Sequence, residues 1–184
     1  YASTCGGCSA GCGTLVTVRD GRPLKMEGMP GHPVSRGGLC AIGQAAPLEL
    51  YDNQRLQQPL IGGEPEEDWE EVDKPLLKKL DSVASSGGKV RFVTPTVTSP
   101  TLQELLNKFL GRYSDARHIV FDVDSCSAIL DAHATTHGKR VLPRYRFEKA
   151  SVIVSFGADF LGTWISPVEF TAGWIQGRTP TEEH

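Results

Sequence analysis

Four cysteines within the first forty residues have the spacing of a metal site. The segment C-G-G-C-S-A-G-C carries Cys5, Cys8 and Cys12, and Cys40 follows after twenty-seven further residues. Thiolate sulfur is the soft ligand that iron-sulfur clusters and zinc select. Three closely spaced thiols can surround one side of a small inorganic cluster, and a fourth thiol can close it from a distant turn. The pattern favours one [4Fe-4S] cluster held by these four residues.

Two other uses of the cysteines stay open. Structural zinc sites usually take two well-separated ligand pairs, whereas the grouping here is three plus one. Disulfides are the common use of cysteine in secreted chains. The chain has five cysteines, however, which is an odd number, and Cys5 and Cys8 are too close in sequence for an ordinary bridge. Either use would make this region a non-redox zinc or structural scaffold module.

The composition is that of an ordinary globular protein. The chain has 184 residues, of which 39% are hydrophobic and 22% charged, and its formal net charge is −3. This charge gives no indication of a nucleic-acid partner. The sequence contains no run of about eighteen apolar residues, so we expect no transmembrane span. Because the chain begins with Tyr1 rather than Met, we expect a truncated piece of a longer protein.

Residues 1–60 are predicted to form a small cysteine-rich β domain. Residues 15–27 read as a β-hairpin, since two alternating segments flank the strong two-residue turn signal Asp20-Gly21. Cys40 returns from a loop rich in Gly and Pro, and a short helix is expected directly after it. The cluster-binding loop would therefore sit on the hairpin.

Residues 61–74 are predicted to be an acidic linker. Seven acids occur in the ten residues from Glu64 to Asp73, and such charge runs are usually solvated. Asp73 is a plausible N-cap of a first helix, with Pro75 in its first turn.

Residues 75–184 are predicted to be a truncated α/β domain. The pattern indicates helices at 73–87, 99–111 and 125–137, and strands at 90–93, 119–123 and 150–157. Strands and helices that alternate at this spacing are typical of a doubly wound parallel sheet. We therefore predict an α/β fold in which the small β domain precedes part of such a sheet.

The loops after the predicted strands are the candidate ligand sites, because parallel sheets bind ligands at the carboxyl ends of their strands. These loops are residues 94–99, 124–127 and 157–164. None carries a dinucleotide fingerprint or a Walker motif. Gly157, Asp159 and Gly162 place two glycines and an acid at a strand end, where they could cradle part of a large cofactor.

A basic stretch precedes the last predicted strand. It consists of Arg140, Arg144, Arg146 and Lys149. These side chains could contact cofactor phosphates or an acidic partner, although a solvated face is the simpler expectation.

The motif C-x2-C-x3-C-x27-C, followed by Gly43 and the extended L-Y-D-N-Q-R-L-Q-Q-P-L, resembles the molybdopterin oxidoreductase superfamily. That superfamily includes formate dehydrogenases, periplasmic nitrate reductases and polysulfide reductases, in which this domain holds the [4Fe-4S] cluster nearest the molybdenum cofactor. Residues 138–174 look like the molybdopterin-oxidoreductase-like iron-sulfur subunit of bacterial alternative complex III, a membrane-associated quinol oxidoreductase.

The resemblance implies an electron-transfer domain of a respiratory oxidoreductase, with one [4Fe-4S] cluster relaying single electrons and no complete active site in this chain. The implied partners are other redox subunits: a ferredoxin-like iron-sulfur domain, a multihaem cytochrome c and an integral membrane quinone-binding subunit. The implied location is the periplasmic side of the bacterial inner membrane, after export of the folded protein.

A catalytic role is the alternative that the resemblance leaves open. The chain would then be the N-terminal part of a molybdenum-bis-pterin oxidoreductase. Molybdenum enzymes of the superfamily often carry a Lys two residues after the fourth cysteine, and here that position is Ile42. Molybdopterin guanine dinucleotide is therefore possible but not favoured.

Overall fold

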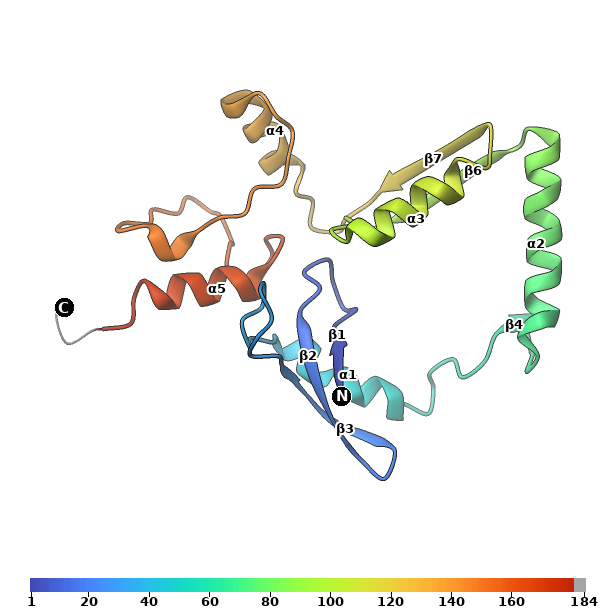
Figure 1. Cartoon of the computed structure of the whole chain (residues 1–184), viewed down its shortest axis with the longest axis horizontal. Coiled ribbons are helices and arrows are strands. Elements are labelled where there is room, and N and C mark those ends of the chain that lie inside the picture. Colours follow the sequence, from blue (N-terminus) through green and yellow to red (C-terminus); the bar gives the residue numbers. More distant parts are fainter. Residues whose placement is uncertain (181–184) are drawn as a thin grey trace. The chain divides into compact units, whose positions relative to one another are not determined.

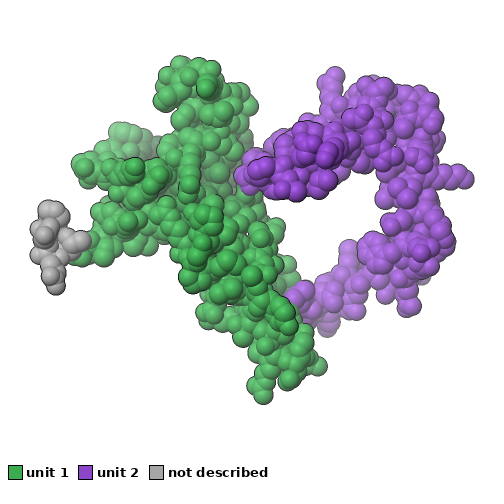
Figure 2. Space-filling view, viewed as in Figure 1, with its two compact units in different colours: residues 1–49, 122–184 green, residues 50–121 purple. Residues whose placement is uncertain are grey.

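The structure, a computed structural model, describes residues 1–180, and its contacts divide the chain into two compact units. The first unit joins residues 1–49 to the chain from residue 122 onward, and the second comprises residues 50–121 (Figure 2). The first unit therefore brings together segments that are more than seventy residues apart in the sequence. The predicted boundaries of 1–60, 61–74 and 75–184 stay a prediction.

A three-stranded antiparallel sheet begins the first unit (Figure 1). Its strands, in the order β1-β2-β3, are β1 (Ala2–Thr4), β2 (Gly13–Arg19) and β3 (Arg22–Gly28). Asp20 and Gly21 connect β2 to β3 with φ values of 49° and 76°. Positive φ at both turn residues matches the twist of the two flanking strands. The predicted hairpin is therefore confirmed.

The expected short helix after Cys40 is also confirmed. Helix α1 spans Ala41–Tyr51, and the amide of Gln44 donates to the carbonyl oxygen of Cys40 at 3.0 Å. Cys40 thus occupies the N-terminal end of α1. The first unit also contains α4 (Ser127–His137), the short 3-10 helix η1 (Phe147–Lys149) and α5 (Pro167–Gln176). Aromatic side chains of Tyr145, Phe147, Phe160 and Phe170 pack between η1 and α5.

The second unit contains a parallel strand pair with a helical crossover. Its elements are β4 (Leu60–Ile61), β5 (Glu64–Pro65), α2 (Trp69–Ser86), β6 (Lys89–Thr94), α3 (Pro100–Leu110) and β7 (Asp115–Val120). Strands β6 and β7 pair in parallel, from Lys89 opposite Asp115 to Thr94 opposite Val120. The side chain of Ser99 caps α3 by accepting from the amide of Leu102. The mixed helix and strand content agrees with the predicted α/β class.

Helix α2 begins earlier than predicted. Its N-cap is Asp68, whose side chain accepts from the amide of Glu70 at 2.8 Å, so the prediction of Asp73 as N-cap is wrong. Glu70 and Glu71 then lie in the first turn, where acidic side chains favour the positive end of the helix dipole. Pro75 consequently lies inside the helix. Part of the predicted acidic linker is therefore the start of α2.

The predicted strands at 119–123 and 150–157 need correction. Strand β7 covers Asp115–Val120, because its register is set by pairing with β6. Residues 150–157 form no strand in the described structure, and Val152, Val154 and Phe156 are largely exposed there. A strand requires a partner for its backbone groups, and this segment belongs to the first unit whereas β6 and β7 belong to the second. A doubly wound sheet of more strands stays a prediction.

None of the helices within residues 1–180 combines the length and the apolar character that crossing a membrane requires.

Candidate metal centre

Three of the four predicted ligands lie on the loop that joins β1 to β2. The amide of Cys5 donates to the carbonyl oxygen of Cys12 at 2.8 Å. This hydrogen bond continues the β1-β2 pairing and brings the two ends of the loop together. Gly11 has a φ of 59°, a left-handed conformation that glycine adopts without steric cost. Short-range pairing of β1 with β2 therefore holds this loop closed and presents its thiols.

The fourth predicted ligand, Cys40, lies where α1 begins. The amide of Gly43 donates to Sγ of Cys40 at 3.5 Å. Amides in the first turn of a helix have no partner within the helix, and they favour a negatively charged sulfur. A Cβ atom built on Gly43 would lie 3.4 Å from Sγ of Cys5 and 2.5 Å from Cδ1 of Leu39. The first turn of α1 therefore lies beside both Cys5 and Cys40.

Cys12 is the most buried of the four, at 4% exposure. Burial raises the pKa of the Cys12 thiol above its ordinary value of 9.0, and the neighbouring sulfurs of Cys8, Cys5 and Cys40 raise that pKa further. The other three sulfurs therefore lie close enough to Cys12 to act on it electrostatically. Four thiolates so close together repel one another, and a bound cation removes that penalty.

These residues fit an iron-sulfur cluster by the chemistry of the donor set. All five cysteines of the chain are free thiols. Within residues 1–180, no three or more His, Cys, Asp or Glu side chains are grouped closely enough to hold one metal ion. That finding concerns a single ion, whereas in a [4Fe-4S] cluster each thiolate binds a different iron. The assignment of the four cysteines as ligands stays a prediction.

The predicted cofactor residues Gly157, Asp159 and Gly162 are not brought to one cavity. Gly157 lines a cavity of about 380 Å³ that also touches Asp124, Cys126 and Trp164. Two of the three predicted ligand loops, at 124–127 and 157–164, therefore do meet.

A second cavity of about 540 Å³ lies beside Cys40. Gly162, Ile42 and residues of α5 line it. Asp159 lines neither cavity, and its carbonyl oxygen instead accepts hydrogen bonds from the amides of Thr163 and Trp164. A cofactor role for Gly157, Asp159 and Gly162 stays a prediction.

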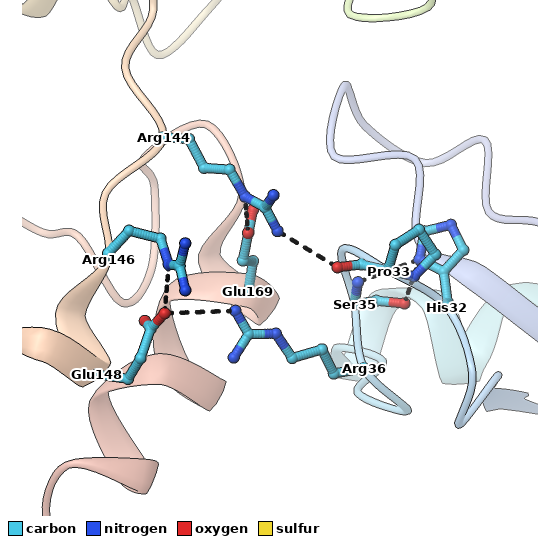
Figure 3. Close-up of polar contacts among 8 residues, drawn as sticks. All are labelled: His32, Pro33, Ser35, Arg36, Arg144, Arg146, Glu148 and Glu169. Atoms are coloured by element: carbon cyan, nitrogen blue, oxygen red, sulfur yellow. Dashed lines mark hydrogen bonds and ion pairs between the residues drawn. The ribbon is translucent and has the colours of Figure 1, made fainter.

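The structure also contains a polar network that the sequence did not indicate (Figure 3). Nε of Arg144 donates to Oε1 of Glu169, and Arg146 donates to Glu148, which Arg36 also approaches. The expected solvated face of the basic stretch is confirmed, because the side chains of Arg144 and Arg146 are 55% and 51% exposed, although each of them also pairs with an acid of its own chain. No sequence pattern indicated the first pair, since its members are twenty-five residues apart.

The network depends on pH through Glu148. The hydrogen bond from Arg146 lowers the pKa of the Glu148 carboxyl below its ordinary value of 4.5, and the charge of Arg36 lowers it further. A carboxyl with a lowered folded-state pKa stabilises the fold above pH 4.5, and this stabilisation is lost as the pH falls through the folded-state value.

We therefore expect a Glu148→Gln variant to be less stable than the wild-type protein at pH 7, with the difference shrinking as the pH falls below 4.5. Urea unfolding of both proteins from pH 7 down to acid pH measures this. A difference that stays constant across the range would contradict it.

Comparison with known proteins finds a family that the N-terminal region matches. Residues 1–52 match the family described as the molybdopterin oxidoreductase Fe4S4 domain. The molybdopterin-binding-like subunit of menaquinone reductase from Nitratidesulfovibrio vulgaris is 28% identical over 184 residues, covering 96% of this chain and 26% of that protein.

Two further relatives are subunits of a reductase and a dehydrogenase by name. The arsenate respiratory reductase molybdopterin-containing subunit ArrA of Shewanella sp. strain ANA-3 is 27% identical, covering 86% of this chain and 20% of that protein. The formate dehydrogenase subunit alpha of Megalodesulfovibrio gigas is 34% identical, covering 59% of this chain and 11% of that protein. The chain thus spans about a quarter or less of the length of the three curated relatives.

Proposed function

We propose that Cys5, Cys8, Cys12 and Cys40 hold one [4Fe-4S] cluster that relays single electrons, and the match of residues 1–52 to the molybdopterin oxidoreductase Fe4S4 domain supports this proposal. The observation that carries the proposal is geometric: a backbone hydrogen bond joins Cys5 to Cys12, and the first turn of α1, which follows Cys40, lies beside Sγ of Cys5. The bound cluster would supply reversible uptake and release of one electron.

The chain's own residues would hold the cluster and limit the access of water to it. The Gly43 amide donates to Sγ of Cys40, and such hydrogen bonds to cluster sulfurs tune the reduction potential. Cys12 lies almost fully buried, whereas Cys8 and Cys40 are exposed. We propose that the exposed side of the centre faces the electron-transfer partner. No residue needs to act as an acid or base in this function.

We further propose that the domain serves a membrane-associated quinol oxidoreductase of the alternative complex III type. The similarity to a menaquinone reductase subunit supports this proposal. Its partners would be a ferredoxin-like iron-sulfur domain, a multihaem cytochrome c and a quinone-binding membrane subunit, on the periplasmic side of the inner membrane. Detection of these subunits after purification of the native complex would test the assignment.

A molybdenum-pterin enzyme is the second candidate, because one relative is by name the molybdopterin-containing subunit of an arsenate respiratory reductase. A pterin dinucleotide carries phosphates, which Arg and Lys side chains usually bind. Neither the 380 Å³ cavity nor the 540 Å³ cavity is lined by Arg or Lys among the described residues. Position 42, beside Cys40, is an isoleucine in place of the Lys common in molybdenum enzymes. These cavities do not fit the pterin, and we derive no step through it.

The experiment that tests the proposed function is EPR on anaerobically purified protein, as isolated and after dithionite reduction, with iron and zinc measured on the same sample. We expect about four irons per chain and an S = 1/2 signal only after reduction. A Cys126→Ser variant is the matched control, since Cys126 lines the other cavity and should not affect the cluster. One zinc per chain and no EPR signal would overturn the proposal.

A further inference from the structure

We propose that Arg144 and Glu169 position the loop that presents Cys40 to the cluster, a role that rests on the proposed function. We name residues 29–40 the Cys40 loop. Arg144 and Glu169 follow this loop by more than a hundred residues in the sequence, yet all three belong to the first unit. The cluster site would thus depend on α5 as well as on the N-terminal sheet.

One guanidinium joins α5 to the Cys40 loop. Nε of Arg144 donates to Oε1 of Glu169 on α5 at 2.5 Å, and Nη2 of the same residue donates to the carbonyl oxygen of Pro33 at 3.3 Å (Figure 3). The side chain of Glu169 is only 7% exposed, whereas that of Arg144 is 55% exposed. A nearly buried carboxylate requires a partner, and removing that partner leaves an uncompensated charge. Glu169 therefore holds Arg144 in place to contact the loop.

The loop itself is shaped by contacts rather than by local preference. Arg36 has a φ of 49°, which is uncommon for a residue other than glycine. Its Nη2 lies 3.9 Å from Oε1 of Glu148. Ser35 is fully buried, and both its amide and its hydroxyl contact Nδ1 of His32. A strained backbone of this kind persists only where surrounding contacts hold it.

The end of the loop touches α5 directly. A Cβ atom built on Gly38 would lie 2.6 Å from Cγ1 of Val168, the residue before Glu169. Gly38 is two residues before Cys40, so a shift of α5 would move the Cys40 backbone with it. The ion pair and the Gly38 contact both act on the Cys40 loop. A substitution at Glu169 should therefore alter the position of Cys40.

The test compares Glu169→Gln and Arg144→Gln with the wild-type protein. Hydrogen exchange of residues 29–40 is measured on the apo-protein, and EPR line shape and midpoint potential are measured on the loaded protein. We expect at least about tenfold faster exchange in this loop in both variants, and a changed EPR line shape in both. Glu27→Gln is the matched control, because it breaks the exposed Lys25–Glu27 pair of the same domain.

If Glu169 and Arg144 affected the cluster only through their charges, the two Gln variants would give a different result. Loss of the negative Glu169 should raise the midpoint potential and loss of the positive Arg144 should lower it, with exchange in the loop unchanged. That outcome would overturn the proposal, as would variants that match the control. An Arg144→Lys variant keeps the charge but loses the planar fork that reaches two partners, and we expect it to show the faster exchange as well.

The same measurements distinguish failure of the proposed electron-transfer function from failure of the positioning role. If the wild-type chain binds no iron, the electron-transfer proposal falls, while hydrogen exchange of the apo-protein still reports whether Arg144 and Glu169 hold the loop. If the wild-type chain binds the cluster and both Gln variants exchange as the wild type does, only the positioning role is refuted.

Discussion

A Cys12→Ala variant is expected to be purified without an intact [4Fe-4S] cluster, with the dithionite-reduced EPR signal lost and iron well below the wild-type content. Cys12 is the buried ligand, and the other three sulfurs all act on it electrostatically. Its removal leaves three thiols around a site that needs four. Solvent-facing Cys8 could be replaced by water or an external thiol, but little space for a substitute ligand exists at a position that is 4% exposed.

Loss of the cluster in this variant must be distinguished from misfolding of the variant protein. Shortening the Cys12 side chain to the methyl group of alanine should cost the apo-protein about 1 kcal/mol of unfolding free energy, the typical cost of a destabilising substitution. Urea unfolding of apo wild-type and apo Cys12→Ala proteins measures that cost, and Cys126→Ser serves as the cysteine control. Full iron content in Cys12→Ala would show that Cys12 is not a ligand.

The sequence predicted best those features that depend on neighbouring residues. The Asp20-Gly21 turn requires positive φ at two successive positions, and both residue types accept it. The helix predicted at 99–111 is confirmed as α3, which begins after Ser99 because the side chain of Ser99 caps its first turn. The placement of Cys5, Cys8 and Cys12 on one short loop between paired strands is likewise a local feature, whereas their role as cluster ligands stays a prediction.

Features that depend on distant partners could not be predicted in this way. The segment 150–157 has the alternation of a strand, but a strand also requires a neighbouring edge, and none pairs with it in the described residues. Asp68 and Asp73 are both of a residue type that commonly caps helices. In the structure α2 begins directly after Asp68, so Asp73 lies inside the helix. The pairing of Arg144 with Glu169 is invisible in the sequence, because any of the chain's acids could have been the partner.

Gly28→Ala is expected to disrupt the Cys40 loop more than any other single added methyl group near it. Gly28 ends β3, opposite Thr14 of β2. A Cβ atom at this position would lie 2.2 Å from the carbonyl oxygen of Gly37 and 2.7 Å from that of Gly38. Both obstacles are backbone atoms, which cannot rotate away as a side chain does. The loop must therefore shift or β3 must separate from it.

The expected cost of Gly28→Ala is about 3 kcal/mol of unfolding free energy, the upper part of the range for overpacked interiors. Since the displaced carbonyls belong to residues just before Cys40, iron content and the reduced EPR signal should fall together with stability. Gly31→Ala is the matched control. A Cβ there meets nothing within 4 Å, and Gly31 is not among the glycines with positive φ.

Both substitutions restrict the unfolded chain to the same degree, so their difference isolates the clash with the loop. Equal stability and equal iron content in the two variants would mean that the loop can move away from β3 without affecting Cys40. In that case the close approach of Gly28 to Gly37 would contribute nothing to the metal centre. The expected ordering, with Gly31→Ala close to wild type and Gly28→Ala depleted of iron, would make the fit between β3 and the loop a condition for bringing the fourth thiol to the other three.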